Sequence, residues 1–213
     1  MLRRLLPRLY PILDTASLAR RGRQPVFFAE AVLEGGARIL QLRHKGHLSR
    51  QMFETAQALA ALCARAGAQF VVNDRADIAA ILDAGLHLGQ DDLAPELARR
   101  VLGPGRLLGF STHNAEQLQS ANSEPADYLA IGPIFTTGSK DRPAPQVGLE
   151  NIPTLRRLTP RPLVAIGGIT RATAQSVLRA GADSIAVIGD LLPEEITKAT
   201  VRERTEEWIR LTQ

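Results

Sequence analysis

The stretch Ile39-Leu-Gln-Leu-Arg-His-Lys45 begins as an apolar run and ends in charged residues, and the same arrangement recurs along the chain. Eight β-rich runs of this kind predict strands, at residues 9–14, 39–45, 69–74, 86–90, 107–112, 128–135, 162–168 and 184–189. Helical stretches alternate with them, at residues 26–33, 51–65, 76–84, 94–101, 115–121, 149–158, 172–180 and 193–211. Several of these stretches end in Gly, as helices often do.

Eight strand–helix units in a chain of 213 residues indicate a closed (β/α)8 barrel, or TIM barrel, with parallel strands and outer helices. An open doubly wound sheet is the alternative, but it normally has about five or six strands. No linker, low-complexity tract or change in composition interrupts the repeat. We therefore expect a single domain over residues 1–213, with a C-terminal helix at about 193–211.

Barrel geometry gives a reason for the polar end of strand 39–45. Parallel strands are buried on both faces, so their sequences should be almost continuously apolar. Side chains alternate along a strand, so Gln41, Arg43 and Lys45 share one face, which we expect to point into the barrel mouth, while His44 points away. Arginine can grip two phosphate oxygens at once, and lysine adds a compact charge. The alternative is a frayed strand end with ordinary surface charges.

Two carboxylates are expected beside this cationic cluster. Asp74 ends the run Phe70-Val-Val-Asn-Asp and Asp92 ends Leu86-His-Leu-Gly-Gln-Asp-Asp, so the two would emerge from neighbouring strands about 5 Å apart. Mg²⁺ commonly takes one or two carboxylates, some waters and substrate phosphate oxygens, which predicts one Mg²⁺ per active site. Two alternatives stay open: both aspartates could cap the helices that follow, and Asp91 could replace Asp92 as ligand.

The last two strand ends carry glycine and predict a second anion site. They read Ala165-Ile-Gly-Gly-Ile-Thr and Ala186-Val-Ile-Gly-Asp. Loops after the seventh and eighth strands of such barrels frequently hold a phosphate through main-chain N–H groups. A Gly-Gly pair is also typical of a tight turn, which is the alternative. The longest aperiodic segment, residues 136–147, has the length of a lid or binding loop.

Composition narrows the possible partners. The net charge is +4 at pH 7 and the pI about 9.8, but the basic residues are scattered and aromatic residues make up only 4%, which favours small anionic molecules over nucleic acid. No stretch suits a signal peptide or a membrane span, so we expect a cytoplasmic protein without a membrane partner. Cys63 is expected to pack inside a helix. The histidines show no zinc-site spacing, and we expect structural or surface roles for all four, at positions 44, 47, 87 and 113.

The strand-end motifs resemble those of the thiamine phosphate synthase family. Seven occur in that family's order and spacing: Gln41-Leu-Arg-His-Lys45, Val72-Asn-Asp-Arg75, His87-Leu-Gly-Gln-Asp-Asp-Leu93, Gly109-Phe-Ser-Thr-His113, Gly132-Pro-Ile-Phe-Thr-Thr-Gly-Ser-Lys140, Gly148-Leu-Glu150 and Ala165-Ile-Gly-Gly-Ile169. Each motif is modest alone, but together they run from about Tyr10 to Gly189. The resemblance implies a TIM-barrel transferase of thiamine biosynthesis. Such an enzyme joins hydroxymethylpyrimidine diphosphate to hydroxyethylthiazole phosphate with Mg²⁺, giving thiamine phosphate and pyrophosphate.

The resemblance also implies roles for individual residues. The pyrimidine diphosphate would be held by Gln41, Leu42, Arg43, His44, Lys45, Asn73, Ser111 and Lys140. The thiazole phosphate would be held by Thr137, Gly138, Ser139, Gly168, Ile188 and Gly189. Asp74 and Asp92 would hold the metal, and the catalytic cations would be Arg43, Lys45 and Lys140. Pyrophosphate would leave first, the aminopyrimidine would stabilise the methylene cation, and the thiazole nitrogen would capture it.

The chain departs from the family pattern at several positions. His44 stands where an acidic residue is common, Asp91 where Glu is usual, Thr136 where Pro is frequent, Ser139 where Thr is typical and Gly189 where Ser often occurs. Gly189 would remove one hydroxyl from the thiazole phosphate, a loss of about 0.5–1.5 kcal/mol, the usual net value of one hydrogen bond.

Two other functions remain possible within the resemblance. A thiazole tautomerase relative shares the barrel, but it would lack the full diphosphate site and carry a catalytic histidine where this chain has Pro133. A non-catalytic sensor of thiamine precursors would have the same ligands without turnover. A homo-oligomer is expected only because most soluble oligomers are built from identical chains.

Overall fold

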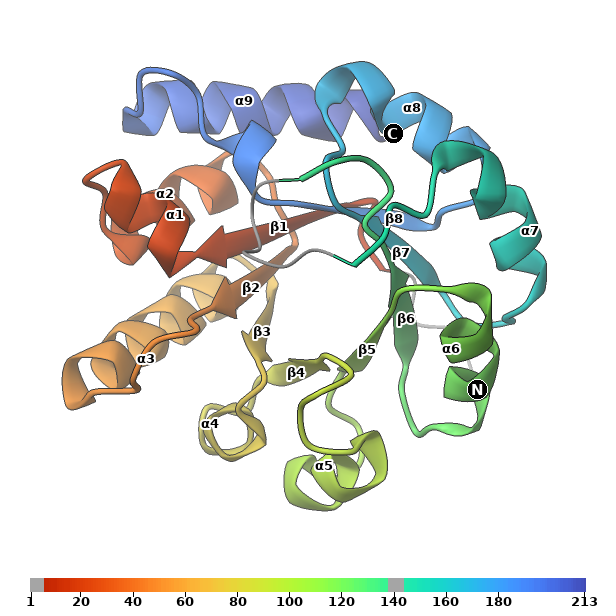
Figure 1. The fold of residues 1–213 in the computed structure, drawn as a ribbon. Helices are drawn as coiled ribbons and strands as arrows, with labels where there is room; N and C mark the ends of the chain where they lie inside the picture. The colour runs from red at the N-terminus through yellow and green to blue at the C-terminus, as the bar shows by residue number, and fades with distance from the viewer. Residues whose placement is uncertain (1–5, 138–143) are drawn as a thin grey trace.

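The computed structural model of the chain describes residues 6–137 and 144–213. Eight parallel strands follow one another in sequence order, and the first pairs with the last, so the sheet closes into a barrel. Figure 1 shows these strands at the centre with the helices arranged around them. The predicted (β/α)8 barrel is confirmed.

The strands start close to their predicted positions, but most end earlier. They are β1 (Leu9–Asp14), β2 (Ile39–Arg43), β3 (Gln69–Asn73), β4 (Gly85–Leu88), β5 (Leu108–Thr112), β6 (Tyr128–Ile131), β7 (Leu163–Ile166) and β8 (Ser184–Val187). The residues beyond these ends belong to the loops of the mouth. Asp74, directly after β3, has a positive φ of 66°, which no strand residue can have.

Helices cover the outside of the barrel. They are α1 (Thr15–Arg20), α2 (Pro25–Glu34), α3 (Arg50–Arg65), α4 (Ala76–Ile81), α5 (Pro95–Leu102), α6 (Ala115–Ser120), α7 (Ile152–Arg157), α8 (Arg171–Arg179) and α9 (Lys198–Leu211), with 3-10 turns η1 (Ala121–Ser123), η2 (Leu149–Asn151) and η3 (Gly189–Leu191). α1 was not predicted. α9 begins at Lys198, later than the predicted residue 193, because the Thr197 side chain accepts a hydrogen bond from the Thr200 N–H and caps the helix there.

The core has two layers, as expected for strands buried on both faces. The outer layer packs the helices against the barrel and contains the fully buried Phe28 and Trp208. The inner layer fills the barrel itself with Tyr10, Ile12, Ile39, Val71, Leu107, Tyr128, Ala130, Val164 and Ala186. Cys63 is buried in the outer layer, and this burial raises the pKa of its thiol to about 12. None of the helices in the described part of the chain combines the length and apolarity that crossing a bilayer requires.

Candidate active site

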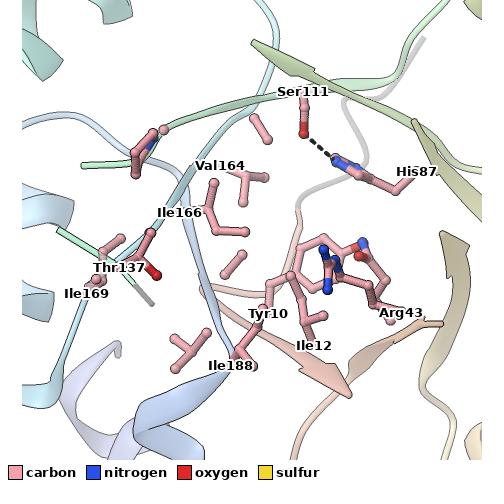
Figure 2. A pocket seen from close by; sticks show the side chains of 18 of the residues that line it. Tyr10, Ile12, Arg43, His87, Ser111, Thr137, Val164, Ile166, Ile169 and Ile188 are labelled. Atoms are coloured by element: carbon pink, nitrogen blue, oxygen red, sulfur yellow. Dashed lines mark hydrogen bonds between the residues drawn. The ribbon is translucent and has the colours of Figure 1, made fainter. Parts of the chain in front are cut away.

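A cavity of about 530 Å³ lies at the carboxyl ends of the strands. Its lining joins residues that are far apart in sequence, among them Arg43 and Asp92 from one side of the barrel and Gly168 and Gly189 from the other. Figure 2 shows Arg43 and His87 on one side of this space and Thr137 on the other. Its volume lies within the about 300–1,000 Å³ typical of small-molecule sites.

A chain of hydrogen bonds links polar side chains at the bottom of the cavity. Gln41 Nε2 donates to the Tyr10 hydroxyl at 3.0 Å, and the Tyr10 and Tyr128 hydroxyls are 2.8 Å apart. Tyr128 lies 2.9 Å from Nδ1 of His87, whose Nε2 lies 2.8 Å from the Ser111 hydroxyl, a contact drawn in Figure 2. Each group in this chain can donate a hydrogen bond to the next, from Gln41 towards Ser111, if His87 is neutral and carries its proton on Nε2. Gln41 Oε1 then remains available as an acceptor and the Ser111 hydrogen as a donor.

The two tyrosines of this chain are held as neutral groups by their environment. Burial raises the pKa of both Tyr10 and Tyr128 well above the usual value for phenols. Gly109 makes room for Tyr128, because a Cβ at Gly109 would lie only 2.0 Å from Tyr128 Cζ. The tyrosines therefore supply fixed, uncharged hydrogen-bonding groups inside the barrel.

Arg43 is held at the mouth by a buried carboxylate that the sequence analysis did not identify. β1 and β2 are in register so that Asp14 lies opposite Arg43, and the two side chains form an ion pair. Asp14 also accepts hydrogen bonds from the Ser17 N–H at 2.8 Å and the Ser17 hydroxyl at 2.7 Å. Burial alone would raise the pKa of Asp14, but the Ser17 hydrogen bonds and then the Arg43 guanidinium lower it below its usual value. Asp14 is therefore ionised and fixes the guanidinium.

Asp74 and Asp92 lie together at the ends of neighbouring strands. Burial raises the pKa of Asp74, the adjacent Asp92 raises it further, and Lys45 opposes both effects with its Nζ 2.5 Å from Asp74 Oδ2. Burial would raise the pKa of Asp92 too, but hydrogen bonds from Asp74 and the Gly89 N–H lower it. Two carboxyl groups so close together repel each other when both are ionised, and a shared proton or a cation relieves that repulsion.

The structure distinguishes between the alternative roles of these carboxylates. Neither aspartate caps the helix that follows it: Arg75 is the N-cap residue of α4 and Ala94 that of α5. Asp92 instead accepts from the Gly89 N–H at 2.6 Å. Asp91 is exposed and does not line the cavity, whereas Asp92 does.

The donor set fits Mg²⁺ of the kind that is partly held by substrate. Within residues 6–137 and 144–213, no group of three or more His, Cys, Asp and Glu side chains could hold a metal by itself. Two carboxylates are nonetheless the usual protein contribution to a Mg²⁺ ion whose other ligands are waters and phosphate oxygens. Asp74 and Asp92 are the residues that would hold it.

The opposite side of the cavity is formed by main chain rather than by charged side chains. Gly167 and Gly168 follow β7 with φ of 98° and 65°. A Cβ at Gly168 would lie 2.4 Å from the Thr136 carbonyl oxygen, so only glycine allows this close approach of the loop after β6. At Gly189, after β8, a Cβ would meet nothing within 4 Å, so the cavity is open there. Ligands can reach the backbone of both strand ends.

Most of the predicted site residues meet in this cavity. Its lining includes Gln41, Arg43, Lys45, Asn73, Asp74, Asp92, Ser111, Thr137, Gly168, Ile188 and Gly189. Two do not: Leu42 packs into the outer hydrophobic core, and the His44 ring contacts Thr15 Oγ1 at 2.8 Å, as its place on the other face of the strand requires. Leu42 and His44 can therefore contact a ligand in this cavity only through their main-chain atoms. Gly138, Ser139 and Lys140 lie outside the described residues.

Several cavity residues were missed from the sequence. Tyr10 and Tyr128 looked like ordinary strand residues, and His87 was expected to be structural or at the surface, yet it lies in the cavity between Tyr128 and Ser111. The fourth histidine, His113, also lines the cavity, where its Nδ1 lies 2.6 Å from the Gly132 carbonyl oxygen. The signal that could have indicated His87 is a polar residue inside an otherwise apolar strand, Gly85–Leu88.

Comparison with known proteins agrees with this geometry. The chain matches the thiamine monophosphate synthase family over residues 9–191. It is 47% identical over 201 residues to a thiamine-phosphate synthase of Koribacter versatilis, covering 92% of this chain and 93% of that protein. A thiamine-phosphate synthase of Chloroflexus aurantiacus is 44% identical over 197 residues, with 92% and 90% covered. The structure of thiamine phosphate pyrophosphorylase from Pyrococcus furiosus superposes with a TM-score of 0.85 at 34% identity, covering 97% of this chain and 95% of that one. The chain belongs to the thiamine-phosphate synthase family.

Proposed function

We propose that this chain, which its relatives show to have thiamine-phosphate synthase activity, binds a pyrimidine diphosphate against β2–β5 and a thiazole phosphate against β7 and β8. The observation that supports this most strongly is the division of one cavity into two unlike sides. One side carries Arg43, Lys45 and the Asp74–Asp92 pair, and the other exposes the glycine backbone after β7 and β8. Two anionic substrates can therefore be held face to face.

The polar chain at the bottom suits the aminopyrimidine ring. Gln41 Oε1 can accept from an exocyclic amino group, and the Ser111 hydroxyl can donate to a ring nitrogen. Because Tyr10 and Tyr128 are buried and neutral, this recognition leaves no uncompensated charge beneath the ring. The apolar Ala130, Val164 and Ile166 line the same cavity and suit the faces of the two heterocycles.

The diphosphate would lie above the ring, among the cations of the mouth. Arg43 presents its guanidinium from the Asp14 pair, and Lys45 lies beside the two carboxylates. Asn73 Nδ2 is the only buried side-chain nitrogen or oxygen without a hydrogen-bond partner in the part of the chain that the structure describes, and Asn73 lines the cavity. A buried donor of this kind is costly unless a ligand accepts from it. Lys140 would add to this group by the family resemblance.

Catalysis would consist mainly of charge stabilisation on the leaving group. Mg²⁺ bound by Asp74 and Asp92 would supply a Lewis acid for the diphosphate. The carbon–oxygen bond to the diphosphate breaks first, and the electron pair leaves with pyrophosphate, whose added charge Arg43 and Lys45 receive in a site already arranged for it. The aminopyrimidine bears the resulting positive charge until the thiazole nitrogen forms the new bond. No general base is needed, because the nitrogen attacks through its lone pair.

The other two functions are less well supported. For a tautomerase, the expected histidine position is occupied by Pro133, and the neighbouring His113 is engaged with the Gly132 carbonyl oxygen. A non-catalytic sensor would hold the same ligands, so a measurement of turnover is what separates it from a synthase.

One reaction distinguishes the three functions. Purified protein is incubated with both substrates and Mg²⁺, and the mixture is analysed for thiamine phosphate and pyrophosphate by chromatography. Equal amounts of the two products are expected. Isomerised thiazole without condensation would indicate a tautomerase, and binding of both ligands without product would indicate a sensor.

A further inference from the structure

Arg204 reaches the cavity from outside the barrel. It lies on α9, which packs along the outside near β8 and β1 in Figure 1, yet its side chain lines the same cavity as Gly168 and Gly189. Its Nη1 donates to the Asp190 carbonyl oxygen at 2.8 Å. Because Asp190 directly follows Gly189, this bond places the guanidinium at the end of β8, on the side of the cavity without other cations from the strands.

Arg204 is less closely paired with carboxylates than its neighbour Arg171. Asp190 Oδ2 accepts from Arg171 Nε at 3.0 Å and from Trp208 Nε1 at 2.9 Å. Glu207 Oε2 lies 2.5 Å from Arg171 Nη1 but 3.8 Å from Arg204 Nε, which is beyond hydrogen-bond distance. Both nearby carboxylates are therefore committed mainly to Arg171 and Trp208.

Within the described residues, Arg204 also retains N–H donors that make no hydrogen bond to protein. A guanidinium has five N–H donors, and Nη1 uses one of them on Asp190. Among residues 6–137 and 144–213, Nη2 has no hydrogen-bond acceptor. The side chain is only 20% exposed, and it lines a cavity that is open at Gly189.

We propose that Arg204 binds the phosphate of the thiazole substrate directly and so determines the preference for a phosphorylated over an unphosphorylated thiazole. Gly189 offers the phosphate a main-chain N–H but no side chain, and the guanidinium supplies charge-assisted hydrogen bonds in its place. The Asp190 carbonyl oxygen, and the salt bridges of Arg171 behind it, keep the guanidinium in position. This inference rests on the proposed function, because it names a further ligand for one of the two substrates.

The test is a comparison of steady-state constants for Arg204→Gln with those of the wild type. We expect KM for the thiazole phosphate to rise about 10-fold or more, since a hydrogen bond to a charged group is lost. KM for the pyrimidine diphosphate should stay within about twofold. KM for the thiazole alcohol, which lacks the phosphate, should also stay within about twofold, so the preference for the phosphorylated form should collapse.

Arg202→Gln is the matched control. Arg202 lies on the same helix, is 48% exposed, and pairs with Glu206 at 3.6 Å without lining the cavity. It should behave as the wild type with all three substrates. Arg204→Lys retains the charge without the fork, and its KM for the thiazole phosphate should lie between those of the wild type and Arg204→Gln.

Three results would overturn the proposal. The first is an unchanged KM for the thiazole phosphate in Arg204→Gln. The second is an equal loss for the phosphate and the alcohol, which would show a purely structural role. The third result applies if Arg204→Gln folds poorly. Inorganic phosphate should then compete with the thiazole phosphate less well in Arg204→Lys than in the wild type. Equal competition in the two proteins would contradict the assignment. If the wild type itself makes no thiamine phosphate, calorimetric binding of the thiazole phosphate to Arg204→Gln and wild type still tests Arg204, and only the proposed function fails.

Discussion

The two sides of the cavity hold anions by different means. On the β2–β4 side, charged side chains are already paired within the protein, Arg43 with Asp14 and Lys45 with Asp74. On the β7–β8 side, the strands contribute glycine backbone, and a cation that lines the cavity there, Arg204, comes from the C-terminal helix. The first arrangement holds positive charge in place for a leaving group, whereas the second only binds the phosphate of a substrate. Substitutions on the first side should therefore alter the rate, and those on the second should alter KM.

The largest effect is expected at the carboxylate pair. Asp74→Asn removes one of two charged Mg²⁺ ligands, so turnover should fall about 100-fold or more, and chelation of the metal should abolish it in the wild type. Turnover is measured against Mg²⁺ concentration, and Mg²⁺ affinity by calorimetry. Asp91→Asn is the matched control because Asp91 is exposed and does not line the cavity. Undiminished activity after exhaustive EDTA treatment would end the metal assignment.

Breaking the support of Arg43 should have a smaller effect on the same side. Asp14→Asn keeps an acceptor for the Ser17 N–H but removes the charge that holds the guanidinium. We expect kcat to fall about 10-fold with little change in KM for the thiazole phosphate. Asp77→Asn, which breaks the exposed Arg75–Asp77 pair, is the control and should leave kcat unchanged. A loss confined to KM for the thiazole phosphate would contradict the division of the cavity.

The same variant gives a pH-dependent prediction. The pKa of Asp14 is lowered in the folded protein, so its ionised form stabilises the fold at pH values above the usual 3.8. That stabilisation is lost as the pH falls through the folded-state pKa. The difference in Tm between the wild type and Asp14→Asn should thus be constant from pH 7 to about pH 5. Below about pH 4 this difference should shrink towards zero. Thermal unfolding followed by circular dichroism measures it, and a gap that widens in acid would be inconsistent with a depressed pKa.

On the glycine side, Gly168→Ala should raise KM for the thiazole phosphate about 10-fold and leave KM for the pyrimidine diphosphate nearly unchanged. The new Cβ would lie 2.4 Å from the Thr136 carbonyl oxygen, so the loop after β6 must move. Gly67→Ala is the control for backbone strain alone. Gly67 has a similar positive φ of 62°, but a Cβ there would meet nothing within 4 Å. Equal effects of the two substitutions would show that strain alone is responsible.

The smallest effect should be an increase in affinity for the thiazole phosphate. Gly189→Ser places a hydroxyl where a Cβ meets nothing within 4 Å, so the side chain fits. One added hydrogen bond is worth about 0.5–1.5 kcal/mol, which lowers KM for the thiazole phosphate by about 2- to 10-fold. In Arg204→Gln the same serine should recover part of the lost affinity. No change in either background would mean that the phosphate lies elsewhere.

The sequence predicted the barrel and most of the rim because both depend on local patterns. Eight alternating units indicate the closed sheet, and strand parity separates Gln41, Arg43 and Lys45 from His44. The strand ends were placed too late because the polar residues there belong to loops, as the positive φ of Asp74 shows.

Other site residues depend on contacts that no local pattern encodes. Tyr10 and Tyr128 could not be separated from the core, because parallel strands are apolar on both faces and do not reveal which residues point inward. The Asp14–Arg43 pair follows from the β1–β2 register, and Arg204 enters the cavity from a helix that the pattern only predicts to be outside the barrel.

The most direct test of the two-sided cavity is a crystal structure of the protein with thiazole phosphate, pyrophosphate and Mg²⁺. We predict pyrophosphate against Arg43 and Lys45, with the metal between it and the Asp74–Asp92 pair, and the thiazole phosphate against Gly168, Gly189 and Arg204. Both anions on one side of the cavity, or either of them outside it, would contradict this account.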